Sequence, residues 1–490
     1  MKPLLLSLFL FFYCYAFPQS ISFDEYARQI NEEFENYSKV KNSEFEEYRN
    51  RINEEFANFM EKNWPKYETA PAIPVPLEPT PPDPYIADPD MEAGKEQLPF
   101  AKIKPLPQEK PKPEPVLPPN PQTPLSPTPD IPKLAFNYYG LECIVPFDPS
   151  LKFNLNNIDE QSVANVWKLL SSSKSVELIK SSVDYRESLG LSDWAYVRFI
   201  EKMAEAIYPS KVNEATLLKF FLLTQSGYKV RIGRNNNQLV MLLPSDGHIY
   251  NYPYIPIDGS RYYIMNKNAT GTHTYLYDRK FPKEQTFSLS METLPDLPLK
   301  KTEYRHLESG YDRGISVDVC VNQNLIDFFN EYPLNDSWNL YAKASLSDYA
   351  KKQLYPKLLE AIENKTEKEA ANILLRFVQK AFKYATDDQQ FGEERPLFAD
   401  ESLYYPYNDC EDRSIFYSIL VKDLLGLDVV MLYYPGHLAT AVNFNSDVTG
   451  DFFLINDKKY IVCDPTYINS NIGMAMPSCK TINAEIIRIY

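Results

Sequence analysis

The sequence lacks an apolar run long enough to cross a membrane as a helix. Residues 4–12 are apolar apart from one serine and lie between Lys2 and Ala16, but a spanning helix needs about 20 apolar residues. A basic residue, a short apolar run and a small residue in this order are typical of a secretory signal. We therefore expect residues 1–16 to be a signal peptide and the mature protein to be periplasmic, at the cell surface or secreted.

An excess of positive charge and several familiar catalytic motifs are also missing. The 490 residues carry a formal net charge of −15, which disfavours nucleic acid and anionic membrane surfaces as partners. The chain has no glycine-rich nucleotide-binding motif, no His-Glu-x-x-His zinc motif and no Gly-x-Ser-x-Gly nucleophile motif. We therefore expect no cofactor and no metal.

Cysteine is scarce: the chain has six, and Cys14 lies in the predicted signal peptide. The others are odd in number, so at least one thiol should stay free in an exported protein. We expect most of them to be buried as small apolar side chains. The spacing of Cys463 and Cys479 would also allow a disulfide.

An aromatic repeat opens the mature sequence. One column of phenylalanines recurs every eleven residues, and a second aromatic column lies three positions further on: Phe23, Phe34, Phe45 and Phe56, then Tyr26, Tyr37, Tyr48 and Phe59. Because eleven residues fill three helical turns, each column stays on one side of a helix. We expect residues 17–68 to form an amphipathic helix that docks on another domain, self-associates as a coiled coil or contacts the envelope.

Proline dominates the next segment, which holds 21 of the chain's 40 prolines between Pro71 and Pro132. Such a composition cannot bury a core and favours polyproline II or disorder. We expect residues 69–133 to be a disordered spacer in front of a folded body.

The folded body is predicted to be α+β, with a first α/β lobe at residues 134–300. Apolar residues recur there at helical spacing in some segments and at strand spacing in others. The expected helices are 159–170, 192–208 and 213–225, and the expected strands are 136–145, 228–232, 238–243, 262–265, 274–277 and 285–290, with a hairpin turn at Asp258-Gly259.

The second predicted lobe is residues 301–490. Its expected elements are a strand at 315–321, helices at 324–330, 347–362 (kinked at Pro356), from Thr366 and at 410–425, and strands at 428–434, 438–444, 452–455 and 460–463. Thr366 and Glu369 have the spacing of a capping box, and Gly426 should end the helix that starts at Cys410.

The segment at residues 384–406 is aromatic and acidic. We expect it to be a solvated loop that forms one wall of a cleft. The pairs Asp387-Asp388 and Glu393-Glu394 could be read as a metal site, but a solvated acidic loop is the favoured interpretation.

Three residues in the second lobe have the order of a cysteine hydrolase. Cys410 opens a predicted helix, and His437 and Asp464 follow at two successive steps of 27 residues, each beside a predicted strand end. A helix N-terminus favours a thiolate through its free N–H groups and its dipole. A sheet packed on this helix could bring the three together as nucleophile, base and base-orienting carboxylate.

This pattern resembles the transglutaminase-like (papain-like) cysteine hydrolase superfamily, and most nearly the secreted transglutaminase-like proteins of the Bacteroidota. The matching motifs are Asp409-Cys410-Glu411-Asp412, Gly436-His437 and Cys463-Asp464-Pro465-Thr466-Tyr467. The resemblance covers roughly residue 134 to the C-terminus. It implies that the C-terminal domain packs a catalytic helix on an antiparallel sheet and carries the triad Cys410, His437 and Asp464.

The expected reaction is attack of the thiolate on an amide bond of a protein or peptide, through a thioester. The backbone N–H of Cys410, with Tyr407 or Asn408 as side-chain contributors, would stabilise the oxyanion. Hydrolysis is the favoured outcome. Transfer to an amine (crosslinking) and a non-catalytic, envelope-tethered binding or assembly module are the alternatives that the sequence leaves open.

The order of elements in the first lobe repeats the order around Cys410. The corresponding positions are Asn213 for Cys410, His248 for His437 and Asn266 for Asp464. We therefore hypothesise that the first lobe is an inactivated duplicate of the catalytic fold.

Overall fold

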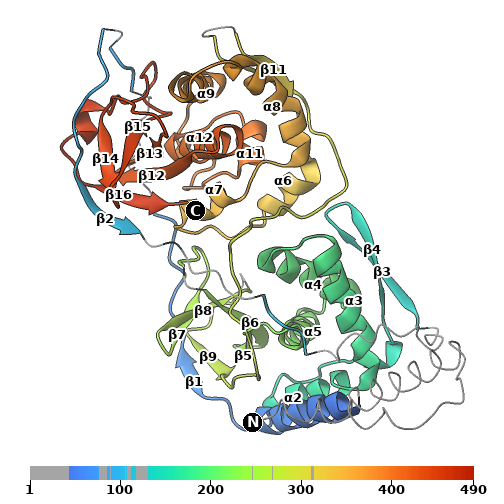
Figure 1. Cartoon of the computed structure of the whole chain (residues 1–490). Helices are drawn as coiled ribbons and strands as arrows, with labels where there is room; N and C mark the ends of the chain where they lie inside the picture. The colour runs from blue at the N-terminus through green and yellow to red at the C-terminus, as the bar shows by residue number, and fades with distance from the viewer. Residues whose placement is uncertain are drawn as a thin grey trace, which may run out of the picture.

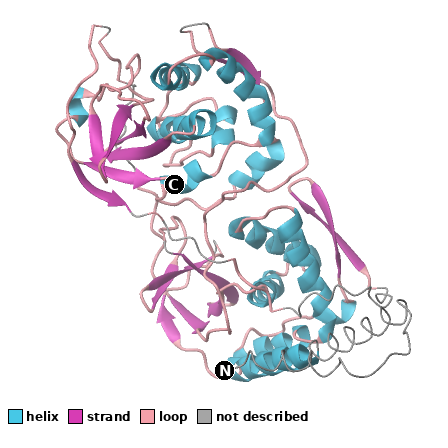
Figure 2. Cartoon of the chain, viewed as in Figure 1, coloured by secondary structure: helices cyan, strands magenta, loops and turns pink. Residues whose placement is uncertain are grey.

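The computed structural model describes residues 43–76, 85–88, 90–104, 106, 112–116, 131–245, 247–266, 269–310 and 314–489. The predicted signal peptide and the first half of the aromatic repeat lie outside these residues. Figure 1 shows two lobes, each with helices packed against a sheet, and Figure 2 shows that both mix helices and strands. This agrees with an α+β protein.

The first lobe contains a helical layer and a six-stranded sheet. Its helices are α2 (Glu160–Leu170), α3 (Val176–Ser188), α4 (Asp193–Ile207) and α5 (Val212–Gln225). Its strands are β1 (Lys66–Glu68), β3 (Lys133–Tyr138), β4 (Leu141–Pro146), β5 (Arg231–Asn235), β6 (Gln238–Ser245), β7 (Tyr254–Ile257), β8 (Ser260–Ile264) and β9 (His273–Tyr277). The sheet order is β1-β9-β5-β6-β8-β7, and β3 and β4 form a separate hairpin.

Three predictions for this lobe need correction. The expected single strand at 136–145 is a hairpin, because Tyr139 and Gly140 adopt positive φ values of 44° and 83° and reverse the chain. The expected strand at 228–232 begins only at Arg231. Residues 285–290 form no strand, and only Gln285 makes an isolated bridge, to Tyr228.

The second lobe is also a helical layer on a six-stranded sheet. Its helices are α6 (Gln323–Phe329), α7 (Trp338–Lys343), α8 (Asp348–Ile362), α9 (Glu367–Ala381), α10 (Asp387–Gln390), α11 (Ala399–Tyr404) and α12 (Cys410–Leu425). Its strands are β2 (Phe100–Lys104), β10 (Arg305–Glu308), β11 (Ser316–Val319), β12 (Asp428–Tyr434), β13 (His437–Asn443), β14 (Phe452–Ile455), β15 (Lys458–Cys463) and β16 (Ala484–Arg488). The sheet order is β14-β15-β13-β12-β16-β2, with β10 and β11 as a separate hairpin.

Local signals set the ends of the helices near the site. Helix α9 starts at the predicted capping box, in which Thr366 and Glu369 exchange hydrogen bonds. Helix α12 starts at Cys410 and ends at Gly426, whose φ of 66° reverses the backbone. Residues 410–421 of α12 are all buried, so this helix runs through the centre of the lobe, as Figure 1 shows.

The described part of the aromatic helix lies on the first lobe. Residues 43–60 are helical, and Phe56 packs against Trp167, Tyr277 and Phe281 with ring centroids 4.8, 4.9 and 5.1 Å away. Phe59, from the second aromatic column, stays 38% exposed. Phe59 contacts the lobe through the guanidinium of Arg279, whose Cζ lies 4.7 Å from the ring centroid. The helix therefore docks chiefly through the first column, in agreement with the docking alternative.

The segment before the two lobes contributes to both sheets. Strand β1, at the end of the predicted helix 17–68, pairs with β9 in the first lobe, so the helical prediction is wrong for residues 66–68. Within the predicted spacer at 69–133, Ala70 bridges Tyr254 of the first sheet, and β2 pairs in parallel with β16 of the second. These spacer residues depart from the predicted disorder, because neighbouring strands satisfy their backbone N–H and C=O groups. Within the described residues, no helix is long and apolar enough to span a membrane.

Candidate active site

The first predicted residue, Cys410, lies at the N-terminus of the buried helix α12. Asp409 is the residue before the helix, and Cys410 is its first residue. The helix is fixed against the sheet by Ser414, whose hydroxyl donates to the carbonyl of Leu438 over 2.9 Å. Arg413 donates to the carbonyl of Phe382 at 2.8 Å, which ties the same helical turn to the end of α9. The thiol is therefore held by elements that are themselves buried.

The structure brings His437 and Asp464 together. His437 opens β13 after a turn in which Gly436 has a φ of 76°, and Asp464 directly follows β15. Nε2 of His437 lies 2.9 Å from Oδ2 of Asp464, and both residues are buried. Because Nε2 is engaged by the carboxylate, Nδ1 is the ring nitrogen left for proton transfer.

Asp464 is itself held in place by its surroundings. Its Oδ1 accepts the backbone N–H groups of Thr466 and Tyr467 at 2.9 and 3.0 Å. Gln379 on α9 donates to the carbonyls of Asp464 and Tyr467 at 3.1 and 2.9 Å. Sequence reasoning did not identify Gln379, since only the fold brings α9 against this loop.

Cys410 lies near this pair, since the backbone N–H of Leu438, the residue after His437, acts to lower the pKa of its thiol. The thiol proton, however, is directed to the carboxylate of Glu411, with 3.1 Å between Sγ and Oε2. Cys410 is 3% and His437 7% exposed. A substrate carbonyl can therefore reach the sulfur only if covering groups move.

The electrostatic surroundings oppose the expected thiolate. Burial, followed by the negative charge of Asp409, raises the pKa of the Cys410 thiol well above its usual value. The sequence predicts a lowered pKa from the helix N-terminus. That prediction is wrong for the protein without ligands, because desolvation and neighbouring carboxylates outweigh the helix dipole.

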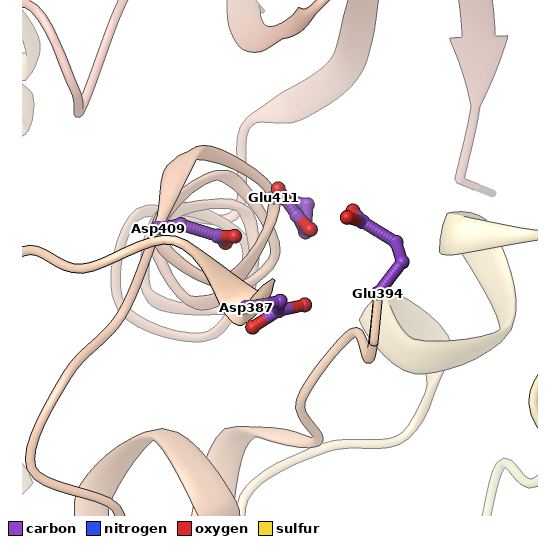
Figure 3. A group of neighbouring side chains, drawn as sticks. All are labelled: Asp387, Glu394, Asp409 and Glu411. Carbon is purple, nitrogen blue, oxygen red and sulfur yellow. The ribbon is translucent and has the colours of Figure 1, made fainter. Parts of the chain in front are cut away.

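Four carboxylates converge at the start of α12 (Figure 3), and one of them, Glu411, accepts a hydrogen bond from the thiol of Cys410. They are Asp387 in α10, Glu394 in the following loop, Asp409 before α12, and Glu411 in its first turn, and one oxygen from each lies within 4.8 Å of the others. Asp387, Asp409 and Glu411 are each at most 2% exposed. The predicted solvated acidic loop is therefore wrong for Asp387, which is buried and faces the carboxylates on either side of Cys410.

Part of this carboxylate cluster has no hydrogen-bond partner. Both oxygens of Asp409 and Oε1 of Glu411 are buried without a donor. Burial raises the pKa of Asp387 to about 11 and that of Asp409 to about 7, with the neighbouring carboxylates adding to the shift of Asp387. Four hard oxygen ligands and buried oxygens without donors fit a divalent cation such as Ca²⁺. Without a cation, protons must neutralise the cluster.

The two predicted oxyanion contributors differ in their surroundings. The Asn408 side chain is 2% exposed, and neither its Nδ2 nor its Oδ1 has a hydrogen-bond partner. Tyr407 is 38% exposed. A buried, unused amide donor beside the nucleophile is the better candidate of the two.

All five cysteines that the structure describes are free and buried, namely Cys143, Cys320, Cys410, Cys463 and Cys479. This confirms the expectation of buried small side chains and leaves Cys463 and Cys479 without the disulfide that their spacing would allow. Comparison of the chain with known protein families, with curated proteins and with solved structures finds no match in any of the three.

Proposed function

We propose that the second lobe is a transglutaminase-like cysteine hydrolase that cleaves amide bonds of proteins or peptides outside the cytoplasm. The observation that carries the proposal is the arrangement of three buried side chains. The thiol of Cys410 lies close enough to the backbone N–H of Leu438, the residue after His437, for that N–H to lower its pKa, and Nε2 of His437 lies 2.9 Å from Asp464. The nucleophile, base and orienting carboxylate thus come from one helix tip and two neighbouring strand ends.

In the proposed reaction Nδ1 of His437 takes the thiol proton, and Sγ of Cys410 forms a bond to the substrate carbonyl carbon. Asp464 stabilises the imidazolium through Nε2. Collapse of the tetrahedral intermediate breaks the C–N bond, and His437 returns the proton to the leaving amine. Water then hydrolyses the thioester by the reverse sequence of proton transfers. An amine in place of water would give transfer instead of hydrolysis.

We propose further that Asp387, Glu394, Asp409 and Glu411 hold a divalent cation, most simply Ca²⁺. The bound ion would supply positive charge next to the thiol, where the chain itself places only carboxylates. Asp409 and Glu411 lie on either side of Cys410, so their orientation and that of the nucleophile are linked through the first turn of α12. The active form of the site would then be the cation-loaded form.

A non-catalytic binding or assembly module is the second candidate. It is favoured by the burial of Cys410 and by the raised pKa of its thiol, since an inert structural cysteine has the same features. The two candidates differ in whether Cys410 reacts at all.

The test is hydrolysis of dye-labelled casein by the full-length protein in millimolar Ca²⁺, with iodoacetamide labelling of Cys410 followed by mass spectrometry. Cys410→Ala and His437→Ala should abolish hydrolysis, whereas Cys143→Ala, a buried cysteine of the first lobe, should leave it intact. Faster labelling of Cys410 in wild type than in His437→Ala would support the Cys–His pair. Equal labelling in both, with no hydrolysis, would leave the binding module as the better candidate.

A further inference from the structure

The two lobes share one topology. The first sheet, read from β7, has the order β7-β8-β6-β5-β9-β1, and the second has the order β14-β15-β13-β12-β16-β2. The strands therefore correspond one by one in chain order, and the first five in each sheet are paired antiparallel throughout. Only the outermost strand differs, because β1 is antiparallel to β9 and β2 is parallel to β16.

The helical layers correspond as well. Helix α5 packs on α4 and β6 in the first lobe, and α12 packs on α9 and β13 in the second. Each lobe also begins with a hairpin (β3–β4 or β10–β11), whose two strands pack on α4 and α3 or on α9 and α8. The repeated element order that the sequence suggested is therefore a repeated fold.

The strand register identifies the counterparts of the triad. Tyr434 pairs with His437 across the β12–β13 turn, and Asn235 pairs with Gln238 across the equivalent β5–β6 turn. Gln238 is therefore the counterpart of His437. The sequence-based assignment of His248 is wrong, because that residue lies beyond the end of β6 and contacts Arg261.

The other two assignments agree with the register. The N–H of Leu239, next to Gln238, donates to Oδ1 of Asn213 at 2.8 Å, and the N–H of Leu438, next to His437, is likewise close enough to lower the pKa of the Cys410 thiol. Asn213 thus takes the place of the thiol.

The third position follows from the neighbouring strands. Thr440, three residues after His437, pairs with Cys463, which precedes Asp464. Met241, three residues after Gln238, accepts the N–H of Met265, which precedes Asn266, at 2.9 Å. Asn266 therefore takes the place of Asp464.

Carboxamides at these three positions exclude the chemistry of the second lobe. Asn213, Gln238 and Asn266 provide no nucleophile, base or ionised orienting group at neutral pH. The amide oxygens of Asn213 and Asn266 instead accept the backbone N–H groups of Leu239 and Met241. They hold the sheet against α5 in a fixed geometry.

The first lobe has a pocket at the position that corresponds to the candidate site of the second. A cavity of about 610 Å³ opens at the tip of α5, and its lining includes Lys211, Asn213, Asn236, Asn237, Gln238 and Thr270. In the described part of the chain, no side-chain hydrogen bond engages Asn236, Asn237 or Gln238. Free carboxamides offer a donor and an acceptor in the geometry of a peptide group.

We propose that the first lobe is a catalytically inert copy of the second, and that this pocket binds an extended polypeptide segment without cleaving it. The polypeptide class of the ligand rests on the proposed function of the second lobe. Two binding points on one substrate chain would raise its local concentration at the catalytic lobe.

The test measures binding of dye-labelled β-casein to the full-length Cys410→Ala protein by fluorescence anisotropy, so that turnover cannot occur. In this background, Asn237→Ala combined with Gln238→Ala should weaken binding about tenfold, the effect of losing two or so hydrogen bonds. Asn165→Ala, an exposed carboxamide of the same lobe on α2, is the matched control and should have no effect. An unchanged Kd in the double variant, or no binding by either protein, would overturn the proposal.

Hydrolysis by the same double variant with Cys410 intact separates this proposal from that of the function. If both hold, KM rises and kcat stays constant. If no variant hydrolyses casein but the anisotropy difference remains, the catalytic proposal fails and the polypeptide-binding pocket stands.

Discussion

At the scale of single residues, the charges around Cys410 decide what the site can do. The helix dipole favours a thiolate, but burial and the neighbouring carboxylates keep the proton on sulfur. The same carboxylates that oppose the thiolate form a group of four oxygens suited to a divalent cation. We therefore expect the protonation and the ligands of buried carboxylates to control both the reactivity of the thiol and the stability of the fold around it.

Removal of the proposed cation provides the first prediction. Ca²⁺ should raise the unfolding temperature of the full-length protein, and EDTA should reverse the rise, because an ion that binds only the folded state stabilises it. Glu394→Gln should remove most of this shift. Glu393→Gln, which changes the same charge at the exposed neighbouring position, should keep it. Equal Ca²⁺ shifts in both variants would argue against a cation in the cluster.

The pH dependence of stability tests a second buried acid, Asp400. Its carboxylate accepts the N–H and the hydroxyl of Ser347, and burial raises its pKa to about 6. The folded protein thus keeps a proton that the unfolded chain releases near about pH 4. Asp400 should therefore lower stability progressively as the pH rises from about 4 to about 6.

Urea unfolding across this pH range in EDTA measures the effect. Asp400→Asn should flatten the decline in the unfolding midpoint relative to Asp388→Asn, which alters an exposed residue. An equally steep decline in both variants would show that Asp400 titrates normally in the folded protein.

At the scale of elements, helix α12 is defined by its two ends. Cys410 and Gly426 mark a helix whose interior is buried among α9, α11 and the sheet. The backbone reversal at Gly426 sets the direction in which the chain runs from α12 into β12. This direction in turn places the β12–β13 turn and His437. The end of the helix therefore influences the position of His437, the proposed base.

Gly426→Ala tests this end. The φ of 66° is unfavourable for residues with a Cβ atom, although no atom within 4 Å would clash with one. We expect a loss of about 1 kcal/mol in the free energy of unfolding from conformational strain. Gly247→Ala is the control, because Gly247 has no positive φ and its added Cβ would make only ordinary van der Waals contacts, with Ser337 and Asp336. Urea unfolding of both variants measures the difference, and no difference between them would contradict the role assigned to Gly426.

At the scale of the whole molecule, the segment before the lobes connects them. The helix at 43–60 lies on the first lobe, β1 joins the first sheet and β2 joins the second. Glu331 of the second lobe also pairs with Lys202 of the first at 3.3 Å. The two related lobes are therefore held together by chain segments as well as by side-chain contacts.

Docking of the N-terminal helix depends on Phe56. Phe56→Ala should destabilise the first lobe by about 3 kcal/mol, as large-to-small changes of a buried aromatic residue do. Phe59→Ala, at the exposed aromatic column, should cost much less. Thermal unfolding measures the loss of stability in each variant, and limited proteolysis measures how readily the helix is released. Similar effects of the two substitutions would show that Phe56 is not the anchor.

The sequence by itself determined the elements whose ends are marked by local chemistry. The capping box of α9, the glycine after α12, strands β12 and β14, and the turn at Asp258-Gly259 all lie where they were predicted. These features depend on residues a few positions apart, so short-range backbone preferences decide them. The order of Cys410, His437 and Asp464 was likewise readable along the chain.

Only the tertiary structure decided which distant residues meet. Strands β1 and β2 take their places through partners more than 200 residues away in sequence. The approach of Asp387 and Glu394 to Asp409 and Glu411 required the fold of the segment before α12. Gln238 could be aligned with His437 only through the strand register. Burial and long-range pairing set these features, and neither is encoded in local spacing.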